Sequence, residues 1–418
     1  MPSIGCQDRL RVALLSYRSN PYCGGQGVYL KNLARGLVSL GHRVEVFSGP
    51  PRPLLPPEIP VTPLNGLDLY DPADPFRLPR LNELITPLNL YEWLNVSSMG
   101  FPEPFLFGYR AYRHLSRHLC DFDVIHDNQS LSYGVHSLSR RLPTVATIHH
   151  PITVDRAIAV RSACHGSEKF KQWRWYSFLT MQKQVAKRLE RIITVSNASM
   201  ADIIKDFKIS QSRLRIVPNG IDTELFRPLP AVAKDPNRII VTNSADTPLK
   251  GLAILIQALS AVAVTHDVRL VVVGRPKENG SIERLIRDLG IGGRVRFTGR
   301  ISDEELVRQY ARASIAIVPS IYEGFGLPAG EAMACGVPVI STTGGALPEV
   351  AGDAAILVPP GDVNPLVRAI VDLLSQPENA QAMGNAGYRR VQERFTWKRT
   401  AERTVSVYKE AIDGHRRP

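Results

Sequence analysis

Ten short apolar runs, most of them followed by a segment with helical periodicity, constrain the fold of this chain more than any other feature. They lie at residues 12–16, 44–48, 124–126, 144–148, 191–195, 239–242, 269–273, 295–298, 314–319 and 338–341. Short, continuously apolar strands separated by helices are typical of parallel sheets that are covered on both faces. The pattern therefore predicts an α/β protein built from doubly wound, Rossmann-like sheets.

The length of the chain predicts two domains. Its 418 residues are more than a single hydrophobic core usually fills. The turn-rich stretch 218–228 follows a finished strand and precedes the next series of strands and helices, so we place the boundary there. Residues 1–218 are assigned to a first domain and residues 219–396 to a second.

Apolar runs and cysteines both indicate a cytoplasmic protein. No apolar run is long enough to cross a bilayer, and the N-terminus lacks the core of a signal peptide. The five cysteines are scattered and have no metal-ligand spacing, so we interpret them as reduced thiols. We expect neither disulfides nor a structural zinc.

Positive charge is concentrated in the first half of the chain. Residues 1–218 hold 27 Lys and Arg against 17 Asp and Glu, whereas the remainder holds 24 against 22. This asymmetry favours either an anionic partner, such as the inner face of a membrane, or a solvated basic face without a partner. The aromatic, basic segment 170–179 is interpreted either as a helix resting on a membrane or as a helix with core aromatics. We expect no nucleic-acid partner.

The region 50–104 departs from the alternation because it is rich in proline. Proline at this density blocks long helices and central strands, so we expect an irregular insertion with short helices. Its leucine and aromatic side chains either pack beneath the loop or line an acceptor site for a lipid or glycan.

The segment 322–336 carries most of the chemistry. Glu323 follows an apolar strand in a loop, and Glu331 lies where the sequence becomes helix-forming. Gly324 and Gly326 between them permit tight turns. Three backbone amides at the positive end of that helix are candidate anion ligands: those of Phe325, Gly326 and Leu327. Such a site would hold hydroxyls through carboxylates and phosphate through the backbone.

This pattern resembles the paired-glutamate signature of retaining glycosyltransferases of family 4, which have the GT-B fold of two Rossmann-like domains facing across a cleft. Further matching motifs occur in the family's order at 20–28, 147–149, 194–196, 217–222, 250–251, 271–275 and 344–349. The resemblance covers nearly the whole chain. It implies that Glu323 contacts the transferred sugar and Glu331 the ribose of the nucleotide. It also implies that the terminal helix, residues 397–418, packs back on the first domain.

The resemblance implies a reaction as well as a fold. A sugar would pass from a nucleotide-diphosphate donor to a hydroxyl of a glycan, glycolipid or small molecule, with retention and same-face attack. The departing phosphate would accept the acceptor's proton, so we expect no enzyme nucleophile, no metal and no other cofactor. Asp121 and Asp123 resemble the metal-binding pair of the other major glycosyltransferase fold, but they precede an apolar strand and are interpreted as a strand-entry loop.

Candidate cations for the donor phosphates are few. Lys250 follows a turn and precedes a helix, from where its ammonium can reach a diphosphate. Many family members carry an arginine six residues earlier, where this chain has Ser244. Arg275, Arg300 or a basic group of the first domain could supply the missing charge.

The first domain is expected to contribute glycines and a histidine. Gly24 and Gly25 follow the first strand, where open α/β sheets bind ligands, and would let the main chain approach the donor. The resemblance implies that His149 hydrogen-bonds the transferred sugar, with His150 as the alternative. His126 ends another strand and could face the same cleft.

Other functions are compatible with parts of this pattern. Two carboxylates also suit a glycoside hydrolase, but a hydrolase needs no turn that cradles a phosphate. A nucleotide-sugar epimerase or a phosphorylase on the same fold is an alternative, although no lysine is marked for the pyridoxal cofactor of a phosphorylase. A non-catalytic nucleotide- or carbohydrate-binding scaffold is the third, because Ser244 replaces the usual arginine.

Overall fold

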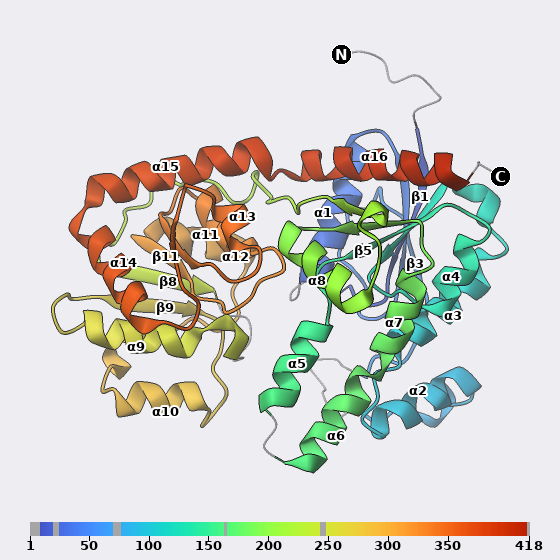
Figure 1. Ribbon diagram of the computed structural model, residues 1–418, viewed down its shortest axis with the longest axis horizontal. Helices are drawn as coiled ribbons and strands as arrows, with labels where there is room; N and C mark the ends of the chain where they lie inside the picture. Colours follow the sequence, from blue (N-terminus) through green and yellow to red (C-terminus); the bar gives the residue numbers. More distant parts are fainter. Residues whose placement is uncertain (1–8, 20–24, 70–76, 163–164, 243–247, 416–418) are drawn as a thin grey trace. The chain divides into compact units, whose positions relative to one another are not determined.

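The computed structural model describes residues 9–19, 25–69, 77–162, 165–242 and 248–415. The chain forms two compact units, each of which contains a parallel sheet with helices on both faces (Figure 1). Unit 1 comprises Met1–Val195, Ser199–Val217 and Thr400–Pro418, and unit 2 comprises Ser196–Ala198 and Pro218–Arg399.

Unit 1 is built on a seven-stranded parallel sheet. Its strand order is β3-β2-β1-β4-β5-β6-β7. The strands are β1 (Arg11–Ser16), β2 (Arg43–Ser48), β3 (Val61–Pro63), β4 (Val124–Asn128), β5 (Thr144–Ile148), β6 (Arg191–Thr194) and β7 (Leu214–Ile216). The order reverses between β1 and β4, and this reversal is the position where doubly wound sheets bind ligands.

Helices cover both faces of this sheet. They are α1 (Gly25–Ser39), α2 (Pro87–Ser97), α3 (Glu103–Leu115), α4 (Tyr133–Ser139), α5 (Thr153–Ser162), α6 (Gly166–Trp175), α7 (Leu179–Ala186), α8 (Asn197–Phe207) and α16 (Trp397–His415). Helix α3 buries Phe107, Ala111 and Leu115, four residues apart, in one core with Ala13 and Leu15 of β1. One face of α3 is therefore fully used for packing.

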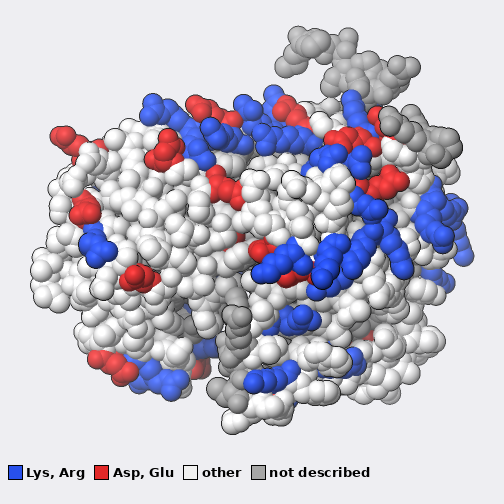
Figure 2. All heavy atoms as spheres, viewed as in Figure 1, with Lys and Arg blue, Asp and Glu red and all other residues white. Residues whose placement is uncertain are grey.

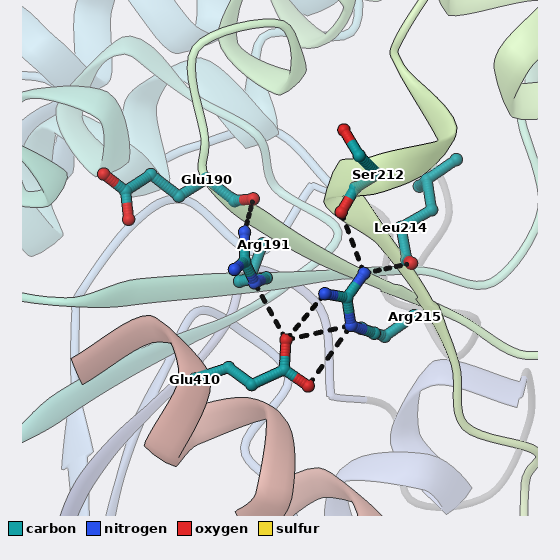
Figure 3. A network of polar contacts seen from close by, with 6 residues as sticks. All are labelled: Glu190, Arg191, Ser212, Leu214, Arg215 and Glu410. Atoms are coloured by element: carbon teal, nitrogen blue, oxygen red, sulfur yellow. Dashed lines mark hydrogen bonds and ion pairs between the residues drawn. The ribbon is translucent and has the colours of Figure 1, made fainter. Parts of the chain in front are cut away.

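Polar contacts attach α16 to unit 1. Tyr408 of α16 lies 2.6 Å from the Nδ1 of His126 in β4. Glu410 accepts hydrogen bonds from Arg191 of β6 at 3.0 Å and from Arg215 of β7 at 2.9 Å (Figure 3). Helix α16 therefore crosses one face of the sheet from β4 to β7.

Unit 2 is built on a six-stranded parallel sheet of order β10-β9-β8-β11-β12-β13. The strands are β8 (Arg238–Thr242), β9 (Arg269–Val273), β10 (Val295–Phe297), β11 (Ile315–Val318), β12 (Val339–Thr342) and β13 (Ile356–Val358). The order reverses between β8 and β11, so the switch point of this sheet lies between the ends of these two strands.

Seven helices of unit 2 lie in the part of the chain that the structure describes. They are α9 (Leu252–Val262), α10 (Ser281–Asp288), α11 (Asp303–Arg312), α12 (Leu327–Ala334), α13 (Leu347–Ala351), α14 (Val363–Ser375) and α15 (Pro377–Arg394). Helix α9 buries Leu255, Ile256 and Leu259 against β8 and β9. Ser302 caps α11 because its hydroxyl accepts from the backbone N–H of Glu305 at 3.2 Å.

The predicted fold class is confirmed, and all ten predicted strands are present. The sequence missed β3, β7 and β13, which are edge strands of three residues each. The short helix α2 confirms the prediction for the proline-rich region, but β3 contradicts a wholly irregular or helical insertion. Pro63 is tolerated in β3 because an edge strand needs no donor on its outer side.

Candidate active site

Two of the charged side chains predicted to bind the donor meet in unit 2. Lys250 follows β8 and Glu323 follows β11, the strands on either side of the switch point. The Nζ of Lys250 lies 2.7 Å from the Oε1 of Glu323. The position at the carboxyl ends of these strands is where ligands of doubly wound sheets bind.

A hydroxyl that the sequence did not single out supports this ion pair. The Oγ of Ser320 donates to the same Oε1 of Glu323 at 2.8 Å. Within the described residues, no hydrogen bond engages the Oε2 of Glu323. That oxygen is therefore available to accept from a ligand hydroxyl.

Backbone contacts hold the Lys250 loop against the Glu323 loop. The N–H of Ile321 donates to the carbonyl of Leu249 at 2.8 Å. Gly251 has a φ of 68°, and a Cβ there would lie 1.9 Å from the carbonyl oxygen of Pro319. Only glycine fits at this position, because both the left-handed backbone and the close approach exclude a side chain.

The predicted phosphate cradle lies at the start of α12. Gly326 precedes this helix with a φ of 101°, and a Cβ there would lie 2.7 Å from the Cδ2 of Leu347. The amides of Phe325, Gly326 and Leu327 lie at or just before the positive end of α12. Phosphate binding by these amides stays a prediction that the helix direction supports.

Glu331 lies one turn along α12, in different surroundings from Glu323. Burial raises the pKa of the Glu331 carboxyl to about 7, and the nearby carboxylate of Asp303 adds to this rise. Its own charge in turn helps raise the pKa values of Tyr310 and Cys335. The residue as a whole is partly exposed.

The loops that carry Arg275 and Arg300 lie side by side. They follow β9 and β10, and Gly274 forms an isolated antiparallel bridge with Gly299. A Cβ on Gly299 would lie 3.1 Å from the Nε of Arg275. Both arginine side chains are exposed at the carboxyl edge of the sheet. Ser244, like Gly24 of unit 1, lies outside the described residues.

In unit 1, hydrogen bonds hold His149 at the carboxyl end of β5. Its backbone N–H donates to the Oε1 of Gln129 at 2.9 Å, and its Nε2 lies 2.8 Å from the Oδ1 of Asn128. The ring packs edge-to-face on Tyr29 with centroids 4.6 Å apart. These contacts fix the ring orientation on a partly buried residue.

The partners of Asn128 determine which nitrogen of His149 carries the proton. The Nδ2 of Asn128 donates to Ser16 and to the carbonyl of Gln26, so its Oδ1 faces the imidazole as an acceptor. The Nε2 of His149 must therefore carry the hydrogen. Burial lowers the pKa of His149 to about 3, with His150 and His126 adding to the effect. The ring is neutral, and its Nδ1 is left as an acceptor.

The prediction that His126 could face a ligand is wrong. His126 is fully buried, and its Nε2 lies 2.7 Å from the Oγ1 of Thr147 while its Nδ1 contacts Tyr408. Both ring nitrogens are therefore engaged within unit 1. Its role is to attach α16 to β4 and β5.

At the first glycine of α1, Gly25, a Cβ would meet nothing within 4 Å, so packing does not require glycine there.

The aromatic, basic segment predicted at 170–179 is exposed at its start, whereas its later aromatics, Trp175 and Tyr176, pack against the core of unit 1. It begins in α6, a helix that buries none of its side chains. Phe170 and Trp173 are 64% and 62% exposed, and their rings stack with centroids 6.3 Å apart. Its later part, including Phe178 and Leu179, is buried. Among the described helices, none is both long enough and apolar enough to span a bilayer.

Comparison with known proteins agrees with this geometry. The profile of Glycosyltransferase Family 4 matches residues 23–225, and that of Glycosyl transferases group 1 matches residues 224–390. The MMP α-(1→4)-mannosyltransferase of Mycolicibacterium hassiacum is 46% identical over 96% of this chain and 98% of its own length. The chain belongs to glycosyltransferase family 4. The predicted activity class, a glycosyltransferase, follows from this membership.

More distant proteins share the fold of this family 4 chain. The D-inositol 3-phosphate glycosyltransferase of Saccharomonospora viridis is 28% identical over 97% of this chain and 95% of its own length. The structure of sucrose-phosphate synthase from Thermosynechococcus elongatus has a TM-score of 0.73 at 25% identity and covers 97% of this chain and 100% of that one. Anabaena HepE in complex with UDP and glucose has a TM-score of 0.70 at 18% identity and covers 96% and 100%. The GT-B prediction is confirmed.

Sequence reasoning on this family 4 chain missed the residues that orient the predicted ones. Ser320 binds Glu323, and Asn128 and Gln129 bind His149. A signal was present for Asn128, because it ends the strand that also contains His126, and polar residues at carboxyl strand ends are candidates for ligand contact. Ser320 follows its strand by two residues and could have been found in the same way.

Proposed function

We propose that this protein is a retaining mannosyltransferase that takes mannose from a nucleotide-diphosphate donor and forms an α-(1→4) linkage to a sugar hydroxyl. The observation that carries the proposal is the ion pair of Lys250 and Glu323 at the switch point of unit 2. The name of the 46% identical relative supports mannose as the sugar and α-(1→4) as the linkage.

Lys250 and the start of α12 would receive the leaving group. Negative charge develops on the diphosphate as its bond to the sugar breaks, and a fixed ammonium next to oriented backbone amides stabilises such charge. Lys250 already has a carboxylate neighbour, which holds its ammonium in position at the site. These groups supply positive charge without a metal, so we propose metal-independent transfer.

The two glutamates would hold hydroxyls in different ways. The free Oε2 of Glu323 would accept from a hydroxyl of the sugar. The carboxyl of Glu331, whose pKa of about 7 makes it partly protonated at neutral pH, can either donate to or accept from a ribose hydroxyl. His149, which is neutral, would accept from a substrate hydroxyl through its Nδ1.

The proposed transfer conserves the anomeric configuration. The bond between the anomeric carbon and the phosphate oxygen breaks, and the acceptor oxygen bonds to the same face of that carbon. The acceptor's proton moves to the departing phosphate oxygen. An α-linked product therefore requires an α-configured donor.

The test is transfer from UDP-, GDP- and ADP-mannose to an α-(1→4)-linked mannose oligosaccharide, with product configuration read by NMR. We expect an α product, turnover that survives EDTA, and a loss of roughly two orders of magnitude in Glu323→Gln. A β product would overturn retention. Turnover abolished by EDTA and restored by a divalent cation would overturn metal independence.

We also propose that unit 1 makes peripheral contact with an anionic membrane through α6. The exposed Phe170 and Trp173 stand among Lys169 and Lys171, a combination that suits an interface of apolar and anionic groups. Figure 2 shows that lysines and arginines gather over the elements of unit 1. Co-sedimentation with phosphatidylglycerol vesicles should fall in the double variant Phe170→Ser, Trp173→Ser; unchanged sedimentation would remove the proposal.

A further inference from the structure

One face of α3 and the turn that follows it carries a continuous basic stripe. Arg110, Arg113, His114, Arg117 and His118 recur at the three- and four-residue spacing that places side chains on one side of a helix. The opposite face packs into the core of unit 1 through Phe107, Ala111 and Leu115. The stripe is therefore held on a rigid, well-packed helix.

These basic side chains line a hollow in the surface of unit 1. The cavity has a volume of about 330 Å³, and its wall is completed by residues 63–65 after β3 and by Leu88 of α2. All five residues of the stripe line it, and no carboxylate from the described part of the chain does. A concave surface with an excess of positive charge attracts anions more strongly than a flat one.

Two positive charges in this cavity are not compensated by a neighbouring carboxylate of the described residues. Arg110 is held by the buried carboxylate of Glu92 at 2.7 Å and by Asn89 at 3.0 Å, so its charge is compensated. Within the described residues, Arg113 and Arg117 have no acidic partner. The two histidines add ring donors: His114 packs on Phe47, and His118 lies 3.6 Å from Asp121.

We propose that this cavity binds a phosphomonoester group. Such a group carries a charge near −2 at neutral pH and matches the two uncompensated guanidiniums, each of which can bind phosphate oxygens bidentately. Arg113 of α3 and Arg117 of the turn that follows carry like charges, and a bound dianion offsets the repulsion between them. The site lies wholly in unit 1 and uses none of the residues proposed for sugar transfer.

The first experiment is isothermal calorimetry of the full chain with methyl phosphate, with glucose 6-phosphate and with inorganic phosphate. Dimethyl phosphate, a monoanion, serves as the reference ligand. We expect monoesters to bind, and their Kd to rise at least about tenfold in the double variant Arg113→Gln, Arg117→Gln. The matched control is Arg399→Gln, Arg403→Gln, an exposed pair on α16 with the same spacing and the same loss of charge; its Kd should stay within about twofold.

The source of the phosphate is distinguished by a second arm. Vesicles that contain phosphatidic acid present a phosphomonoester, whereas phosphatidylglycerol vesicles present only a diester. Preference for phosphatidic acid that is lost in Arg113→Gln, Arg117→Gln would assign a lipid headgroup, and preference for glucose 6-phosphate would assign a soluble metabolite.

Three results would overturn the proposal. They are binding that is weakened equally by the α16 control pair, equal affinity for dimethyl phosphate, and binding that disappears in Lys250→Ala while it persists in Arg113→Gln, Arg117→Gln. The last result would place the phosphate in the donor site instead. Retained binding in Lys250→Ala keeps this inference separate from the proposed transferase activity.

Discussion

Two ion-pair sites, one in each unit, have similar distances between their charged atoms but lie at different positions in their sheets. Lys250 and Glu323 of unit 2 are 2.7 Å apart, and Glu410 of unit 1 lies 2.8 Å from Arg215 and 3.0 Å from Arg191. The first pair stands at the carboxyl ends of the strands that flank the switch point. The second joins α16 to β6 and β7, where Arg191 is the first residue of its strand (Figure 3).

This difference indicates that position in the sheet, more than pairing itself, separates a functional charge from a structural one. At a switch point the surrounding backbone leaves room for a ligand, so a charge there can act on a substrate. A charge that joins a helix to the outer face of a sheet is satisfied by its partners, and its removal should affect stability alone.

The largest expected effect tests the pair in unit 2. Lys250→Ala should lower kcat by about 10²- to 10³-fold, because the proposed function places this fixed cation next to the leaving phosphate. Steady-state kinetics of mannosyl transfer provide the measurement. The control is Lys205→Ala on the exposed side of α8, which should keep near-normal activity. Equal losses in both variants would contradict the assignment.

A glycine substitution in each unit gives the next largest effect. Gly251→Ala should lower the free energy of unfolding by roughly 2 to 4 kcal/mol, because it combines a positive φ with a backbone clash. Gly25→Ala meets no atom within 4 Å and should leave stability within about 0.5 kcal/mol. Urea unfolding compares them. A loss of activity without a loss of stability in Gly25→Ala would indicate ligand contact there.

The buried histidine of unit 1 predicts a smaller, pH-dependent effect. Burial lowers the pKa of His126 to about 3 from 6.5, so between these values the unfolded chain binds a proton that the folded chain does not. Stability that this residue contributes is present above pH 6.5 and is lost as pH falls, by about 2 kcal/mol between pH 7 and pH 5.

Comparison with His126→Gln isolates this effect, because the amide does not titrate. The stability gap between the parent protein and the variant should shrink by about 2 kcal/mol from pH 7 to pH 5 in urea unfolding. Glu331 and Glu103, whose pKa values are raised by burial to about 7, act in the opposite direction and cancel in this difference. A gap that stays constant would argue against a neutral, buried His126.

The smallest effect belongs to the structural ion pairs. Glu410→Gln should lower the free energy of unfolding by about 0.5 to 1 kcal/mol, because its partners are partly exposed. The loss should be smaller in 0.5 M salt, because the Debye length shortens and charges at the surface are screened. The rate of mannosyl transfer should be unchanged. A variant with reduced transfer and unchanged stability would contradict the purely structural role of Glu410.

The sequence predicted the architecture because each central strand is a continuous apolar run with a turn at its end. Glu323 and Lys250 could be placed together for the same reason. They lie 73 residues apart, yet each follows a strand, and carboxyl ends of parallel strands share one edge. The three missed strands are edge strands of three residues each, but β10 has the same length and an edge position and was predicted, so short length alone does not explain the omission.

Contacts between segments that are distant in the chain could not be predicted from the sequence. The misassignment of His126 shows why, since its position at a strand end indicated exposure, while Tyr408 of a helix 282 residues away covers it. The different surroundings of the two glutamates were equally hidden. The pKa of Glu331 depends on how α12 packs beside Tyr310 and Asp303, and local sequence does not report that packing.

The backbone contact between residues 249 and 321, together with the tight fit of Gly251 under Pro319, has a thermodynamic consequence for substrate capture. Because this junction is already ordered in the folded protein, little disorder remains to be removed when the proposed sugar-nucleotide donor binds. The affinity for the donor should therefore derive mainly from direct contacts between protein and ligand. A substitution that loosens the contact between the two loops should weaken donor binding even when every charged side chain is retained.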